Sequence, residues 1–188
     1  MQNIRLVMIR DHMDHFPLFS CPPGYIIRPF KRLHDERLWA MIETKAGEFP
    51  SQEKALERFE AEFGAFLDEM EDRCFLLEES GGQAIGTATA WTGNLDGERR
   101  GRVHWVGIVP EYQGRALAKP LLSAVMTRLA QDVQKVYLTT QTTSYRAVNL
   151  YLSFGFVPYL SGADARKDGW LLMERVLQKR ILPVHDSP

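Results

Sequence analysis

The chain has 188 residues, of which 45% are apolar and 25% charged, and its formal net charge is −1. A chain of this length and composition can bury the core of one α/β domain. The balanced charge gives no basic field for nucleic acid or anionic lipid. No apolar run approaches the ~20 residues of a membrane-spanning helix, and residues 1–12 lack a signal-peptide pattern. We therefore expect a cytoplasmic protein without nucleic-acid or membrane partners.

The cysteine and histidine residues do not form a recognisable metal or redox motif. Cys21 and Cys74 are too far apart for such spacing and are interpreted as inert thiols. His12 and His15 are three residues apart, but no third ligand lies near them in the sequence, so surface histidines are the better interpretation. We expect no metal.

The first third of the chain predicts two short strands and a helical region. Residues 4–9 are apolar enough for a strand peripheral to the main sheet, and residues 25–29 form a second strand. Residues 35–46 place apolar side chains at helical spacing. Ser51 is a helix N-cap residue, and Gly64 leaves open whether one helix or two follow it.

The rest of the chain alternates strand and helix patterns. Residues 94–101 are polar and charged and are interpreted as a loop, and residues 162–169 as a turn-rich loop. Strands are predicted at 73–78, 84–91, 103–109, 135–140, 156–160 and 170–176, and helices after residue 117 and after a cap at Ser144. This order predicts one α/β (α+β) domain over residues 25–178, a mixed sheet with helices on both faces. Residues 1–24 would be an N-terminal extension, a peripheral strand and loop, and residues 179–188 a tail.

The stretch from residue 102 to 122 organises this pattern. A β-branched and aromatic strand ends at Pro110, a polar turn follows, and apolar side chains then recur every four residues. A strand, turn and helix in this order aim free helix N-terminal N–H groups at one point, which suits an anion and above all a phosphate. The turn contains neither a P-loop nor a dinucleotide-binding motif.

The sequence VPEYQGRALAKPLL resembles the central motif of the acetyl-CoA-dependent N-acyltransferase (GNAT) superfamily. Gln113 and Ala118 fit that motif, and Ala116 stands where the family usually has glycine. About thirty residues later, residues 144–156 resemble the family segment Asn-x-x-Ala…Tyr-x-x-x-Gly-Phe, with Ser144 in place of asparagine. The resemblance covers roughly residues 25–176.

The resemblance implies a centrally splayed sheet with acetyl-CoA in the opening. Pantetheine would pair with the backbone of Gly107, Ile108 and Val109, and Ser144 and Tyr151 would also contact the cosubstrate. Arg115 and Lys119 are either phosphate ligands or ordinary solvated cations. The residues implied to hold the pyrophosphate are Gln113, Gly114, Arg115, Ala116, Leu117, Ala118 and Lys119.

The family chemistry is direct attack of an amine on the thioester, which needs a base and an acid. Tyr151 matches the position of the family's acid; its alternative is a core aromatic. His104 lies on the strand where family members often place a base, and histidine titrates near neutral pH. Its alternatives are a half-buried structural histidine and a water chain that does the work instead. Arg102, on the same strand, cannot act as a base.

The acceptor side is implied to involve the first two helices and their connection. Trp39, Glu43, Glu48 and Phe49 combine carboxylates with aromatic rings, which suits an ammonium ion. The alternative is that Trp39 is core and Glu43 part of a solvated face. Gln141 and Thr139, at the end of a later strand, could also line the cavity.

Two functions of different classes follow. The first is an N-acetyltransferase that moves an acetyl group from acetyl-CoA to a primary amine of a small molecule or peptide. The second is a CoA-binding or regulatory interaction module of the same fold without catalysis, because Ala116 and Ser144 depart from the motifs. The oligomeric state stays open, with a homodimer as one alternative.

Overall fold

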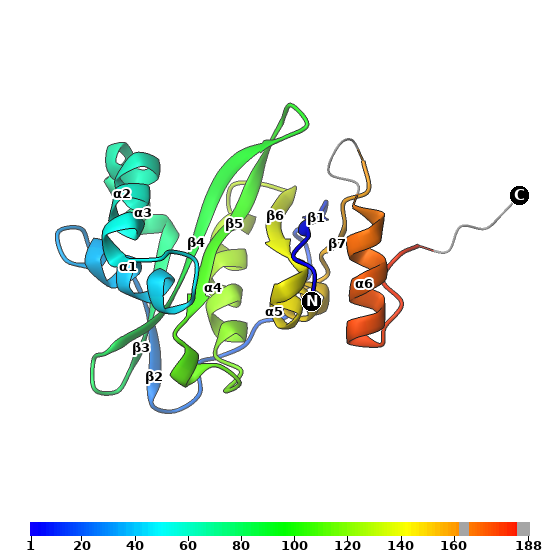
Figure 1. The fold of residues 1–188 in the computed structure, drawn as a ribbon. Helices are drawn as coiled ribbons and strands as arrows, with labels where there is room; N and C mark the ends of the chain where they lie inside the picture. The colour runs from blue at the N-terminus through cyan, green and yellow to red at the C-terminus, as the bar shows by residue number, and fades with distance from the viewer. Residues whose placement is uncertain (162–165, 184–188) are drawn as a thin grey trace, which may run out of the picture. The chain divides into compact units, whose positions relative to one another are not determined.

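The computed structural model describes residues 1–161 and 166–183 and contains a mixed seven-stranded sheet (Figure 1). Counted from one edge of the sheet, the first strand is antiparallel to the second and the second to the third. The third and fourth strands form a hairpin, and the fifth pairs in parallel with the fourth. In sheet order the strands are β2 (Tyr25–Pro29), β3 (Cys74–Glu79), β4 (Ala84–Leu95), β5 (Glu98–Ile108), β6 (Val136–Gln141), β1 (Arg5–Arg10) and β7 (Val157–Pro158). The α+β fold expected from the sequence is confirmed.

By its contacts the chain forms two compact units. Unit 1 comprises residues 1–16, 92–102 and the chain from 133 onward, and unit 2 comprises residues 17–91 and 103–132. The long strands β4 and β5 run through both units. Each unit has its own packed interior.

Unit 2 packs helices against its strands. Figure 1 shows α1 (Asp35–Lys45), α2 (Gln52–Phe63) and α3 (Leu67–Arg73) on one side of β4 and β5, with α4 (Ala118–Ala130) on the other. α4 packs on β2 and β3, and α1 packs on α2. The interior between helices and strands is aromatic, and its fully buried rings are Phe30, Trp39, Phe59 and Phe63.

The helix boundaries of unit 2 follow local rules. Arg28 binds the buried carboxylate of Asp35 with two nitrogens, at 2.5 and 3.0 Å, which ties the start of α1 to β2. The Ser51 hydroxyl accepts a hydrogen bond from the backbone N–H of Lys54, which confirms the predicted N-cap of α2. Gly64 begins a short 3₁₀ turn, so the structure has two helices here rather than one.

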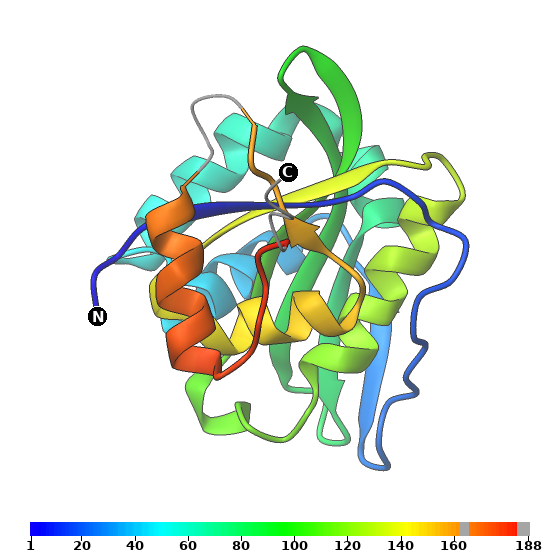
Figure 2. The same cartoon turned by 90° about the vertical axis from the view of Figure 1, so that its right-hand side faces the viewer.

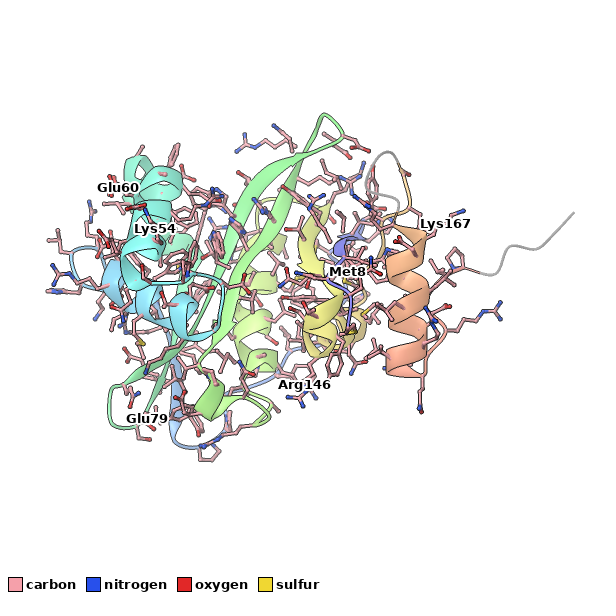
Figure 3. The ribbon with its side chains drawn as sticks, in the orientation of Figure 1. Met8, Lys54, Glu60, Glu79, Arg146 and Lys167 are labelled. Carbon is pink, nitrogen blue, oxygen red and sulfur yellow. The ribbon has the colours of Figure 1, made fainter. Side chains whose placement is uncertain are left out.

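Unit 1 contains a strand that the sequence placed at the periphery. β1 pairs antiparallel with β6 from Arg5↔Gln141 to Arg10↔Val136, and its other edge pairs with β7. Figure 2 shows β1, in blue, running beside β6, in yellow, and Figure 3 labels Met8 on β1, which is fully buried. The prediction of a peripheral strand is wrong, because both edges of β1 are hydrogen-bonded.

The last predicted strand is a helix. Residues 170–176 belong to α6 (Lys167–Leu177), which packs on β1 and on α5 (Tyr145–Ser153). Trp170 and Met173 are completely buried and three residues apart, which is a helical spacing. The strand-like composition of residues 170–176 led to the prediction of a strand instead. The predicted loop at 162–169 therefore ends at α6; its residues 162–165 lie outside the described ranges. Of the helices in those ranges, none is both long and apolar enough to cross a bilayer.

The predicted loop at residues 94–101 is a hairpin. β4 continues to Leu95 and β5 begins at Glu98, so only Asp96 and Gly97 form the turn. Both have positive φ, 48° and 82°, which is the backbone that an Asp-Gly pair provides in a two-residue hairpin. The charged residues around this dipeptide led to the wrong interpretation, because they lie on strands with one exposed face.

Candidate active site

The turn after β5 has the geometry that an anion site needs. Pro110 starts a 3₁₀ turn after the strand, and α4 begins at Ala118. Gly114 has a φ of 78° and Ala116 a φ of 60°. Two left-handed residues so close together turn the backbone sharply, so that successive N–H groups can face one side.

The N–H groups of this turn are available to a ligand. Across the described part of the chain, no protein acceptor binds the backbone N–H groups of residues 115–118, and α4 has no side-chain cap. The Arg115 guanidinium is exposed, donates to the Tyr25 hydroxyl at 3.1 Å and lies over the Tyr112 ring. Lys119 is exposed and lies 5.0 Å from the Phe19 ring. Unpaired N–H groups beside two cations fit the pyrophosphate of a coenzyme A.

The left-handed Ala116 explains why glycine is usual at this position. An L-residue in this region is strained by roughly 1–2 kcal/mol, whereas glycine adopts it readily but makes the unfolded chain more flexible. We expect Ala116→Gly to raise the free energy of unfolding by up to about 1 kcal/mol without weakening CoA binding. Urea denaturation measures the first and calorimetry the second. Ala118→Gly, in the first turn of α4, is the matched control and should be destabilising; a loss of stability in Ala116→Gly would contradict the strain argument.

The backbone at the end of β5 is only partly open. The N–H of Val109 donates to the carbonyl of Ile85 at 2.9 Å, and the carbonyl of Ile108 accepts from Nε2 of Gln113 at 2.8 Å. The expectation that residues 107–109 all present free backbone groups is therefore wrong for these two groups. Gln113 ties the phosphate turn back to its own strand instead.

The ring of His104 on β5 is hydrogen-bonded to a glutamate carboxylate. Its Nε2 lies 2.5 Å from Oε1 of Glu62 on α2, and Oε2 of Glu62 accepts from the indole N–H of Trp105 at 3.2 Å. His104 is 7% exposed. Trp105 has a φ of 47°, an outlier for an aromatic residue in a strand, so β5 is locally irregular at this site.

The charge state of Glu62 is set by these neighbours. Burial alone would raise the pKa of its carboxyl, but the hydrogen bond and charge of His104 outweigh burial. Trp105 and Arg58 add to this effect, and the pKa falls to about 2. Glu62 is therefore an anion at neutral pH, and it orients the His104 ring.

The rings of Trp39 and Phe49, both predicted for the acceptor side, meet the ring of Trp105 in unit 2. The Trp39 ring lies 5.9 Å from Phe49 and 5.5 Å from Trp105, and Phe49 lies 5.2 Å from Trp105, between ring centroids. Trp39 is completely buried, so the core interpretation is correct for its ring, whereas Phe49 and Trp105 are half-buried. Rings in this arrangement can hold an apolar stem or a cation.

Glu43 is not on a solvated face. It is completely buried, and a methyl group at Gly107 of β5 would lie 2.7 Å from its Oε1. Burial, with the charge of nearby Glu48, raises the pKa of Glu43 well above its ordinary value. Glu48 is exposed as a residue, but its carboxyl lies against the protein, and this partial burial raises its pKa too.

Unit 1 holds the remaining predicted residues. Tyr151 is 6% exposed on α5, with its ring 6.1 Å from that of Phe156. Ser144 stands at the N-cap position of α5, as predicted, but its side chain makes no capping hydrogen bond. Gln141 ends β6 and is half-buried, as is Thr139.

The structure thus brings the turn, His104, Trp39, Glu43 and Phe49 into unit 2, and Gln141, Ser144 and Tyr151 into unit 1. Sequence reasoning missed Glu62 and the left-handed Trp105. Glu62 is 42 residues from His104 and belongs to a helix rich in glutamate, so no local signal distinguishes it. Among the described residues, no group of three or more His, Cys, Asp and Glu side chains could hold a metal.

The mixed sheet and the strand–turn–helix between β5 and α4 define an α+β protein with a turn suited to a phosphate group. Residues 33–156 match the model of the acetyltransferase (GNAT) family. The chain belongs to this family, as the two sequence motifs predicted.

Curated relatives and solved structures agree with this assignment. The chain is 32% identical over 148 residues to a mycothiol acetyltransferase of Kocuria rhizophila, a match that covers 73% of this chain and 47% of the relative. It is 31% identical over 147 residues to one of Pseudarthrobacter chlorophenolicus, covering 74% and 45%. The chain therefore spans about half the length of these relatives. A GCN5-related N-acetyltransferase from Sphaerobacter thermophilus has the same fold, with a TM-score of 0.66 at 24% identity over 84% of this chain and 48% of that one.

Proposed function

We propose that the protein is an N-acetyltransferase that moves the acetyl group of acetyl-CoA to a primary amine. The observation that carries the proposal is the turn between β5 and α4, with two left-handed residues and unpaired N–H groups at residues 115–118. Such a cradle suits a pyrophosphate. Family membership supports acetyl transfer, and the two free cysteines suit a reducing compartment such as the cytoplasm.

The proposed chemistry needs two proton transfers. The acceptor arrives as an ammonium ion, and His104, oriented by Glu62, takes one proton from it. The amine nitrogen then bonds to the thioester carbonyl carbon, and the carbon–sulfur bond breaks. Tyr151 gives its phenolic proton to the departing thiolate and regains one from solvent. The second proton lost by the nitrogen leaves to solvent.

The proposed acceptor site combines charge and aromatic surface. Glu43 and Glu48 supply carboxyl groups, and the rings of Trp39 and Phe49 supply aromatic surface. A primary amine suits this chemistry, because an ammonium ion is attracted by carboxylates and by aromatic faces. The curated relatives are named for mycothiol, so unacetylated mycothiol belongs in the acceptor panel.

The first experiment tests whether the protein binds acetyl-CoA. Calorimetry with acetyl-CoA should show binding, and thiol release should follow addition of an amine from a panel of alkylamines, amino sugars and peptide amines. Absence of binding at millimolar acetyl-CoA would contradict the proposal. Binding without thiol release would favour the non-catalytic module, which the departures Ala116 and Ser144 motivated.

Two glycine variants test whether the turn between β5 and α4 binds acetyl-CoA. Gly114 and Gly97 both have positive φ, and a β-carbon would meet no atom within 4 Å at either. We expect Gly114→Val to weaken acetyl-CoA binding by at least about 10-fold, because a β-branched residue is strained there and distorts the cradle. Gly97→Val carries the same strain in the β4–β5 hairpin and should bind acetyl-CoA like the wild type. Equal affinity in both variants would show that the turn does not bind the cosubstrate.

A further inference from the structure

The Glu43 carboxyl is an unusual group for a protein interior. It is completely buried, and within the described ranges neither of its oxygens has a hydrogen-bond partner. The indole N–H of Trp39, one helical turn earlier on α1, is also buried without a partner. Leaving a buried polar group unpaired costs free energy, so a polar ligand that paired with these two groups on one helix face would be stabilised.

The surroundings of Glu43 show what kind of ligand it could take. Its carboxyl lies against Gly107, and any side chain at that position would collide with it. The rings of Trp39, Phe49 and Trp105 form an aromatic layer in the same unit. The segment after α1, with the exposed Glu48 and half-buried Phe49, is the outer edge of this cluster. Carboxyl groups and aromatic faces together favour a cation, not an anion.

We propose that Glu43 is uncharged in the free protein and ionises when a primary ammonium group binds beside it, so that it selects the acceptor as a cation. This inference rests on the proposed function and deepens it. When R–NH₃⁺ binds, the proton of Glu43 leaves to solvent and the carboxylate pairs with the ammonium; no covalent bond changes. The deprotonation that precedes acetyl transfer remains the role of His104.

The groups that face Glu43 support this electrostatic account. Glu48 is the charged neighbour whose repulsion disfavours the ionised form, and burial acts in the same direction. Cys74 on β3 is also near, but burial raises the pKa of its thiol to about 11, so it stays neutral. α2 faces α1 with Ala55, Phe59 and Phe63, none of which titrates. A bound ammonium would place a positive charge beside the Glu43 carboxyl, and it would stabilise the carboxylate.

A stability measurement tests the protonation state without any ligand. Because the folded pKa of Glu43 is raised, its contribution to stability is lost as pH rises from about 4.5 toward the folded value. Glu43→Gln removes this loss, so its melting temperature relative to the wild type should increase between pH 5 and pH 8 by about 2–4 °C or more. Glu53→Gln, an exposed carboxyl on α2, is the control and should show no such trend. A pH-independent difference for Glu43→Gln would overturn the proposal.

Binding and kinetics test the selection of a cation. Phenethylamine is the probe and 2-phenylethanol its uncharged counterpart. In calorimetry with two buffers of different ionisation enthalpy, binding of phenethylamine should release protons from the wild type and none from Glu43→Gln. The alcohol should bind no more tightly to the wild type than to the variant. Absence of amine binding, or equal proton release from both proteins, would overturn the proposal.

The kinetic signature separates this inference from the proposed function. With an amine that the wild type acetylates, Glu43→Gln should raise KM for the amine by about 10-fold or more, with little change in KM for acetyl-CoA. The wild-type KM for the amine should fall as pH rises, and the variant should lose this dependence. An active Glu43→Gln enzyme with wild-type KM values would refute the role of Glu43 and leave the acetyltransferase intact. A wild type that acetylates no amine would refute the proposed function itself.

Discussion

Tyr151→Phe is expected to lower kcat by about 10²–10⁴-fold, the usual contribution of a general acid. The hydroxyl is the only group that the substitution removes, and the buried ring remains in its place on α5 beside Phe156. The departing thiolate would then leave without a proton donor. Steady-state kinetics with saturating acetyl-CoA measures the effect.

Two controls show whether this loss is chemical. Tyr145→Phe removes a phenol from the first residue of the same helix and should leave kcat unchanged. Tyr151→Phe should melt close to the wild type and bind acetyl-CoA with similar affinity, because packing is preserved. A Tyr151→Phe enzyme with wild-type kcat would show that Tyr151 is a core aromatic, the alternative that the sequence left open.

His104→Gln should lower kcat/KM for the amine by a similar factor of about 10²–10⁴. Glutamine keeps a donor for the half-buried Glu62 carboxylate, so this hydrogen bond is kept, but glutamine cannot accept the ammonium proton. The wild-type rate should rise with pH as the imidazole loses its charge, and the variant should lose this rise. The pH profile of kcat/KM between pH 5 and pH 9 measures both effects.

A substitution of Glu62, the hydrogen-bond partner of His104, also tests the proposed base. Glu62→Gln keeps the shape of the pair but removes its negative charge, so the rising limb of the pH profile should move to lower pH. His12→Ala, at an exposed histidine, should leave the profile unchanged. If His104→Gln keeps the wild-type profile, the base is a water chain or another residue, and His104 is structural.

Local patterns predicted the parts of the fold that neighbouring residues determine. The strand at residues 25–29, the Ser51 cap of α2 and the end of α5 at Gly155 were each readable, because a cap or a turn depends on a few consecutive residues. The strand–turn–helix at residues 103–130 was equally readable, and with it the anion cradle. The sequence also indicated that Ala116 stands where the family usually has glycine. The positive φ of Ala116 shows why glycine is usual at this position.

Sequence patterns gave wrong predictions where tertiary contacts determine the secondary structure or the place of a strand in the sheet. Residues 170–176 have strand-like composition, but α6 buries Trp170 and Met173 at helical spacing against neighbours. Intrinsic strand propensity is weak compared with such burial. β1 was interpreted as peripheral because its pairing partners, β6 and β7, are about 130 and 150 residues away along the chain. Nothing in residues 4–9 specifies that both edges are paired.

The sequence by itself determined the family, and it singled out the turn proposed to hold the cosubstrate and the residues proposed for acid and base, because each motif is short and continuous. Only the tertiary structure decided the state of the charged groups. Glu62 is ionised and hydrogen-bonded to His104, whereas Glu43 is buried beside Gly107 and has no hydrogen-bond partner among the residues that the structure describes. Burial and pairing depend on segments that are distant in the chain, and a carboxyl carries no sequence mark of its solvation. For that reason the sequence left Glu43 open between an acceptor contact and part of a solvated face, and the structure excludes the solvated face because the residue is completely buried.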